Sequence, residues 1–111
     1  MYRSYLARHF KKQLKPFVKK YPALASDIVS TLEHFDPRQH SALGEDTYKI
    51  RLRSTDLPKG KSKSFRLIIL LLHREHLLVP IALFLKSERS TITKTEIRWH
   101  IERLREELES Q

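Results

Sequence analysis

The sequence contains no cysteine and only two glycines among its 111 residues. The lack of cysteine excludes disulfides, zinc sites with thiolate ligands and thiol catalysis. The longest apolar run, Leu67 to Leu72, is too short to cross a membrane as a helix. The N-terminal residues lack the continuous apolar stretch of a signal peptide. We therefore expect a cytoplasmic protein without membrane contact.

Motifs of several enzyme classes are also missing. The chain has no glycine-rich phosphate loop, no H-E-x-x-H and no cluster of carboxylates able to hold two metal ions. Among the scattered histidines, His73 and His76 flank a predicted turn, and we favour an exposed structural role for them over metal binding. Trp99 is interpreted as a packing residue rather than a base-stacking platform. The sequence therefore predicts no metal site and no small-molecule cofactor.

Lysine and arginine, in contrast, are abundant and unevenly distributed. The chain carries 22 Lys and Arg against 13 Asp and Glu, for a net charge of +9. Residues 1–20 hold seven cations and no anion, and residues 48–66 hold seven cations and one anion. Solubilising charge would be spread more evenly, so these blocks favour a phosphate-binding surface. For the first block alone, a solvated helix face is the preferred interpretation.

The hydrophobic pattern predicts one α+β domain over residues 1–111. Residues 2–6 fit either a short strand or the first turn of a helix. Helical spacing then runs from Arg8 to Tyr21, interrupted or kinked by Pro16, and from Ala23 to Phe35. Residues 38–46 show no periodicity and are expected to form a connecting loop.

Three strands are predicted next, over Tyr48–Arg53, Phe65–His73 and Leu77–Lys86. The second is apolar on nearly every residue and should be central, whereas Pro80 in the third indicates an edge position or a bulge. A capping box at Thr93-Lys94-Thr95-Glu96 starts a C-terminal helix. We expect a small antiparallel sheet of three or four strands packed against the two N-terminal helices.

The cations between Tyr48 and Arg66 allow one reaction without a metal ion, the cleavage of RNA. RNA supplies its own nucleophile, the 2′-hydroxyl, so cleavage needs a base, an acid and positive charge on the pentavalent phosphate. Arginine provides such charge bidentately, and a lysine crowded by other cations can act as base or acid. Electrostatic binding of phosphates without catalysis is the alternative, and composition alone favours it.

Four segments in order resemble the RelE/HigB-like toxins of bacterial toxin–antitoxin pairs. They read FKKQLKPFVKKYPALASDI, TYKIRL, KGKSKSFRLI and LFLKSERSTITKTEI. The resemblance implies a sheet backed by two helices, a C-terminal helix contacted by an antitoxin, and cleavage of mRNA at the ribosomal A site. It implies catalytic roles for Arg51, Lys61, Arg66 and Lys86. Further cations predicted to bind RNA are Lys49, Arg53, Lys59, Lys63 and Arg89.

The sequence departs from the family pattern at three places. Lys63, Ser64 and Phe65 stand where the family usually has two glycines before the strand arginine. Phe84 replaces a tyrosine and has no hydroxyl for proton transfer, and Pro80 replaces a hydrogen-bonding strand residue. Charge stabilisation is thus better supported than proton transfer.

Three functions follow from these patterns. The first is a metal-independent endoribonuclease toxin that is silenced by an antitoxin. The second is an RNA- or protein-binding module of the same fold, and the third is a gyrase inhibitor of the related ParE kind. The segment Leu77 to Leu85 is apolar on both faces, which fits either a partner site or burial under the last helix.

Overall fold

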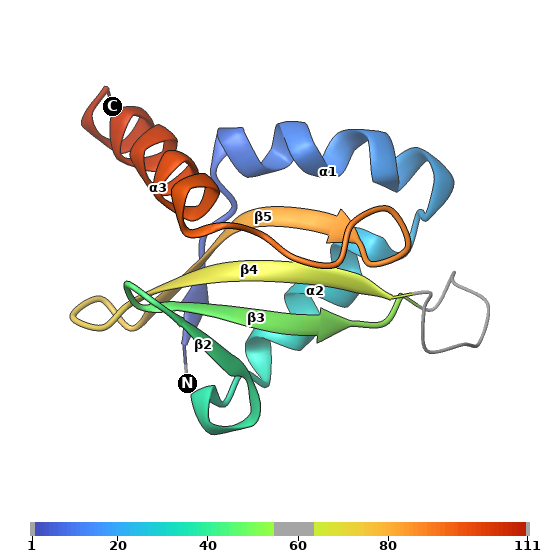
Figure 1. Ribbon diagram of the computed structural model, residues 1–111, viewed down its shortest axis with the longest axis horizontal. Coiled ribbons are helices and arrows are strands. Elements are labelled where there is room, and N and C mark those ends of the chain that lie inside the picture. Colours follow the sequence, from blue (N-terminus) through green and yellow to red (C-terminus); the bar gives the residue numbers. More distant parts are fainter. Residues whose placement is uncertain (1, 55–63, 111) are drawn as a thin grey trace.

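The apolar runs of the sequence form a sheet with helices on both faces, shown in Figure 1. The computed structural model describes residues 2–54 and 64–110. The helices are α1 (Arg8–Lys20), α2 (Leu24–Glu33), α3 (Lys94–Glu109) and the 3₁₀ helix η1 (Pro37–Gln39). The strands are β1 (Arg3–Ser4), β2 (Ser41–Gly44), β3 (Thr47–Leu52), β4 (Phe65–Leu72) and β5 (Leu77–Leu85).

Within the described residues the sheet has five strands in the order β1-β5-β4-β3-β2. The predicted α+β class and the central position of β4 are confirmed. The expectation of three or four antiparallel strands is wrong, because β1 adds a parallel pairing with β5 and β2 adds a further antiparallel strand. Of the two interpretations of residues 2–6, the short strand is the one observed.

Strand β2 forms where the sequence predicted a loop. Its residues are exposed or half-buried, so they leave no alternating apolar pattern. A tight turn joins β2 to β3, with positive φ angles at Gly44 (87°), Glu45 (54°) and Asp46 (60°). The Thr47 hydroxyl donates a hydrogen bond to the Gly44 carbonyl at 2.6 Å, which closes this turn. Turn geometry and pairing with β3, rather than burial, therefore define the strand.

The sheet separates two hydrophobic cores. On one face, α1 and α2 pack against the sheet through fully buried residues that include Phe10, Ile28 and Phe65. On the other face, α3 places Ile97 and Leu104 against residues of β4 and β5. The second face of β5 is thus buried under the last helix, which is one of the two outcomes the sequence allowed.

Pro80 coincides with an irregularity in the β4–β5 ladder. The register shifts between Ile68 and Ile69 of β4, so β5 carries an extra residue beside Pro80, as the bulge prediction required. The Gln13 side chain of α1 then hydrogen-bonds the outer edge of β5, donating to the Ile81 carbonyl at 2.8 Å and accepting from the Leu83 amide at 3.3 Å. Pro16 lies inside α1, which continues to Lys20.

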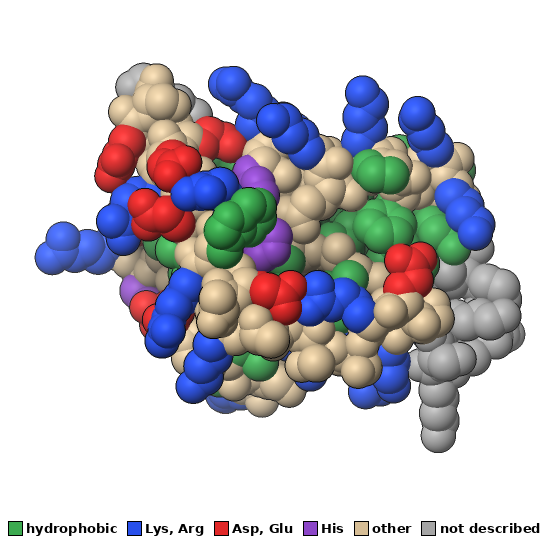
Figure 2. All heavy atoms as spheres, turned by 45° about the horizontal axis from the view of Figure 1, so that its top comes forward, with side chains coloured by type: hydrophobic (Ala, Val, Ile, Leu, Met, Phe, Trp, Pro, Cys, Tyr) green, Lys and Arg blue, Asp and Glu red, His purple; other side chains and the backbone are tan. Residues whose placement is uncertain are grey.

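Helices α1 and α3 meet along a polar seam formed by His9, Trp99, His100 and Glu107. A ring nitrogen of His9 lies 2.8 Å from one of His100, and the Glu107 carboxylate accepts hydrogen bonds from the amides of Arg8 and His9 at 2.9 and 3.0 Å. In Figure 2, histidine side chains lie between the two helices, with basic side chains along α1. Glu107 therefore supplies the cap that Ala7, the N-cap residue of α1, cannot provide.

The capping box predicted for α3 is present, with the Thr93 hydroxyl accepting from the Glu96 amide at 3.1 Å and the Glu96 carboxylate accepting from the Thr93 amide at 3.2 Å. Among the described helices, none combines the length and apolar character needed to span a bilayer.

Candidate functional site

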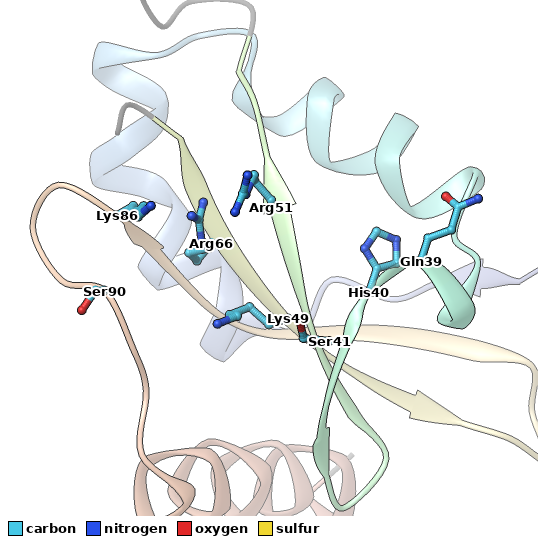
Figure 3. A pocket seen from close by; sticks show the side chains of 8 residues that line it. All are labelled: Gln39, His40, Ser41, Lys49, Arg51, Arg66, Lys86 and Ser90. Carbon is cyan, nitrogen blue, oxygen red and sulfur yellow. The ribbon is translucent and has the colours of Figure 1, made fainter. Parts of the chain in front are cut away.

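A cationic pocket opens on the sheet face that carries α3, and no residue of α3 lines it. Its volume is about 560 Å³. The lining residues are Gln39, His40, Ser41, Lys49, Arg51, Arg66, Lys86 and Ser90. Figure 3 shows that Arg51, Arg66 and Lys86 cluster at one side of this pocket, while Gln39 and His40 stand at the other. We call this hollow the cationic pocket.

Strand alternation places the cations of β3 in the cationic pocket. Tyr48, Ile50 and Leu52 pack against the first core, so Lys49 and Arg51 project from the opposite face. Arg51 is exposed, and its partner in the ladder is Arg66 of β4. The two arginines therefore lie directly opposite each other, an arrangement in which like charges repel.

Arg66 is the most buried of these cations, with an exposed fraction of 4%. Its Nη1 donates to the Ser64 hydroxyl at 2.5 Å and to the Phe65 carbonyl at 3.4 Å. Burial lowers the pKa of the Arg66 guanidinium, and the neighbouring charge of Arg51 lowers it further. The group remains a cation, but it has lost much of its hydration and favours an anionic ligand.

Lys86 reaches the pocket from the residue after β5. Its backbone amide donates to the Ser64 carbonyl at 3.0 Å, which extends the pairing between the ends of β4 and β5. This bond fixes the backbone of Lys86 beside Ser64, two residues before Arg66. Among the described residues, no ion pair involves Lys49, Arg51, Arg66 or Lys86. Their charges are thus available to a ligand.

The structure brings four of the predicted site residues together: Lys49, Arg51, Arg66 and Lys86. It places Arg53 after β3, exposed and outside the pocket lining. Arg89 also lies outside the lining, because its guanidinium forms two 2.8 Å hydrogen bonds with Glu96 and lies 5.1 Å from the Phe84 ring centroid. Lys59, Lys61 and Lys63 lie outside the described residues, so their roles stay predictions.

Sequence reasoning missed the uncharged half of the lining: Gln39, His40, Ser41 and Ser90. The first three belong to the segment predicted as a loop, which reaches the pocket because β2 pairs with β3. His40 is distinctive, since its ring lies parallel to that of Phe35, with 5.4 Å between centroids and 6° between planes. The sequence signal that could have indicated His40 is the preceding Asp36-Pro37. A short helix at that point directs the chain back to the sheet.

The pocket can bind a phosphate group among its four cations. Arginines on neighbouring strands offer bidentate donors, and Lys49 and Lys86 add point charges. Among the described residues, no group of three or more His, Cys, Asp or Glu side chains could hold a metal ion. The lining supports charge stabilisation of a phosphate by protein groups alone.

Comparisons with known proteins relate this fold to solved structures. No protein-family model matches the chain, and no curated protein matches it. The intact E. coli RelBE toxin–antitoxin complex matches with a TM-score of 0.50 and 21% identity, over 75% of this chain and 94% of the other. A mutant of E. coli toxin RelE in the free state matches with a TM-score of 0.51 and 21% identity, over 79% and 86%.

The chain has a RelE-like fold. The resemblance carried by the four sequence segments is therefore confirmed at the level of structure. At 21% identity the match establishes the fold alone.

Proposed function

We propose that this protein is the toxin of a toxin–antitoxin pair and a metal-independent endoribonuclease that cleaves mRNA on the ribosome, in the cytoplasm. The observation that carries the proposal is the convergence of Lys49, Arg51, Arg66 and Lys86 on one pocket. These cations come from β3, from β4 and from the residue after β5, and no carboxylate among the described residues pairs with them.

The fixed guanidinium of Arg66 and the anchored backbone of Lys86 favour catalysis over loose electrostatic binding. Arg66 is buried and bonded to Ser64, and Lys86 is tied to the same residue through its backbone. Groups held in this way stabilise developing charge without reorganising during the reaction. The 2′-hydroxyl of RNA can attack its own phosphate there, so no metal-bound nucleophile is required.

The RelE-like fold supports the remaining parts of the proposal. One structural neighbour is a toxin bound to its antitoxin. We infer a cognate antitoxin for this chain as well, and expect a small acidic protein to be encoded beside it. Lys61 retains its proposed catalytic role, and Lys59, Lys63, Arg53 and Arg89 their proposed contacts with RNA.

A second candidate function rests on Phe84, which lies opposite Arg66 in the β4–β5 ladder and has no hydroxyl. A pocket without a proton donor there would grip RNA without cutting it. This candidate is a non-catalytic binding module of the same fold.

Induced expression in a bacterial host, with mapping of mRNA 5′ ends, tests the proposal. Expression should arrest growth and produce cuts phased with codons, and Arg51→Ala and Lys86→Ala should abolish the cuts. The matched control is Arg74→Ala, which removes an exposed arginine from the β4–β5 turn, outside the pocket lining. Co-expression of the neighbouring acidic protein should restore growth.

The other outcomes assign other functions. Growth arrest with intact mRNA that still depends on Arg51 identifies the binding module. Arrest accompanied by a DNA damage response, with intact message, identifies a gyrase inhibitor. Either result overturns the nuclease.

A further inference from the structure

Cleavage at the cationic pocket needs a group that accepts a proton, and the cations of the lining do not provide one in their ordinary charged form. Phe84 cannot take part, because it has no hydroxyl. Gln39, Ser41 and Ser90 do not titrate near neutral pH. Among the described lining residues, His40 is therefore the side chain that changes protonation in the physiological range.

The imidazole of His40 is held in a fixed orientation. It stacks on Phe35, a residue that is 8% exposed and belongs to the first core. The His40 amide donates to the Pro37 carbonyl at 3.4 Å, which fixes the backbone at the end of η1. Among the described residues no hydrogen bond occupies either ring nitrogen, so both are available to a ligand.

Burial of His40 favours its neutral imidazole. Burial lowers the pKa of His40, and Asp36 opposes this shift only in part. The Asp36 carboxylate is itself bound to Arg38, 3.0 Å away. The groups facing His40 across the pocket are the cations Lys49, Arg51, Arg66 and Lys86, so no other anion of the described lining favours the imidazolium.

We propose that His40 is the general base of RNA cleavage, which rests on the nuclease function proposed above. Its ring nitrogen accepts the 2′-hydroxyl proton while that oxygen forms a bond to the adjacent phosphorus. The bond from phosphorus to the 5′-oxygen breaks, and this oxygen takes a proton from water, which the open pocket admits. The products are a 2′,3′-cyclic phosphate and a 5′-hydroxyl, and the imidazolium returns its proton to the hydroxide left in solvent.

The test measures the single-turnover cleavage rate of mRNA on purified ribosomes between about pH 5 and pH 8, the range in which histidine titrates. The wild-type rate should rise with pH and level off once His40 is neutral. His40→Gln should lower the rate by about 10²- to 10⁴-fold and remove this acidic limb. His40→Phe preserves an aromatic ring against Phe35, so it should bind ribosomes normally and fail to cut.

His34→Gln is the matched control, since His34 is exposed at the end of α2 and lines no part of the pocket. Its rate and pH profile should match the wild type. If His40→Gln cleaves at the wild-type rate, or keeps the acidic limb of the pH profile, His40 is not the general base. The nuclease proposal is unaffected by either result. Cleavage by His40→Phe at the wild-type rate also overturns the assignment of His40 as the base. That result would show that the stacked ring, and not a ring nitrogen, is required. If the wild-type protein fails to cut at every pH, it is the nuclease proposal that fails.

Discussion

Arg51 and Arg66 are partners in the β3–β4 ladder, and no carboxylate among the described residues neutralises them. Like charges placed directly opposite in a sheet destabilise it. Burial of Arg66 adds a desolvation cost, visible in the lowered pKa of its guanidinium. The pocket is therefore maintained at the expense of stability, as expected for a site that awaits an anion.

At this scale we expect Arg51→Gln to stabilise the protein. Removing one charge of the pair should raise the free energy of unfolding by about 0.2–1 kcal/mol in low salt. Urea denaturation measures the change, and added KCl should shrink it by screening the repulsion. Arg74→Gln, in the exposed β4–β5 turn, should leave stability unchanged. A destabilised Arg51→Gln protein would show that the arginine pair contributes packing that outweighs its repulsion.

Among the elements, β5 depends on a side chain from another layer. β1 pairs only with Leu77 and Leu78, so the edge beyond them needs other partners. Gln13 of α1 supplies both a donor and an acceptor to that edge, at Ile81 and Leu83. Its amide does what a neighbouring strand would do, beside the bulge at Pro80.

Gln13→Ala should therefore lower the free energy of unfolding by about 1–3 kcal/mol, the cost of leaving part-buried backbone groups without partners. Hydrogen exchange should also speed up at the Leu83 amide. Lys11→Ala, on an exposed position of the same helix, is the control and should change neither quantity. Unaltered exchange at Leu83 in Gln13→Ala would mean that this edge is protected by other groups.

The sequence predicted those elements whose signal is local. Phe65 to Leu72 reads as a buried central strand from its composition, and Thr93 with Glu96 predicts the start of α3 from chemistry four residues long. β2 could not be predicted in this way, because its exposed residues form a strand only by pairing with β3. The role of Glu107 in capping α1 was also missed, because it accepts hydrogen bonds from Arg8 and His9, which lie 99 and 98 residues away in the sequence.

The site residues divide in the same way, between those with a local sequence signal and those that depend on the fold. Charge and the family resemblance singled out Lys49, Arg51 and Arg66, and the pairing of β3 with β4 brings these three side chains to one pocket. His40 depends on the fold of residues 36–44, whose path no periodic pattern indicates. Arg89 was grouped with the pocket by charge alone, and its bonds to Glu96 appear only once α3 is in place.

For the whole molecule, the net charge of +9 predicts RNA binding that weakens with salt. The logarithm of the affinity should fall linearly with the logarithm of KCl concentration. Arg51→Gln and Lys86→Gln should each reduce the slope by about 0.7 for single-stranded RNA, one phosphate contact apiece. Fluorescence anisotropy with a labelled RNA measures both slopes.

Lys19→Gln provides the comparison, since it removes an exposed charge near the end of α1, outside the cationic pocket. Its slope should equal that of the wild type. A reduction in slope as large as that of Arg51→Gln would mean that RNA binding depends on the total charge of the protein and not on the cationic pocket.

The seam between α1 and α3 gives the protein a built-in optical reporter. The only tryptophan of the chain, Trp99, lies there, 5.4 Å from the His9 ring and 5.1 Å from the His100 ring. Burial lowers the pKa of both histidines, that of His100 to about 4. Folding thus favours the neutral form of both rings, and the unfolded chain binds protons first as pH falls below about 6.5, so acid weakens the seam. The fluorescence of Trp99 will therefore report the separation of α1 and α3 in acid. Ligand binding in the cationic pocket has to be followed with a separate label.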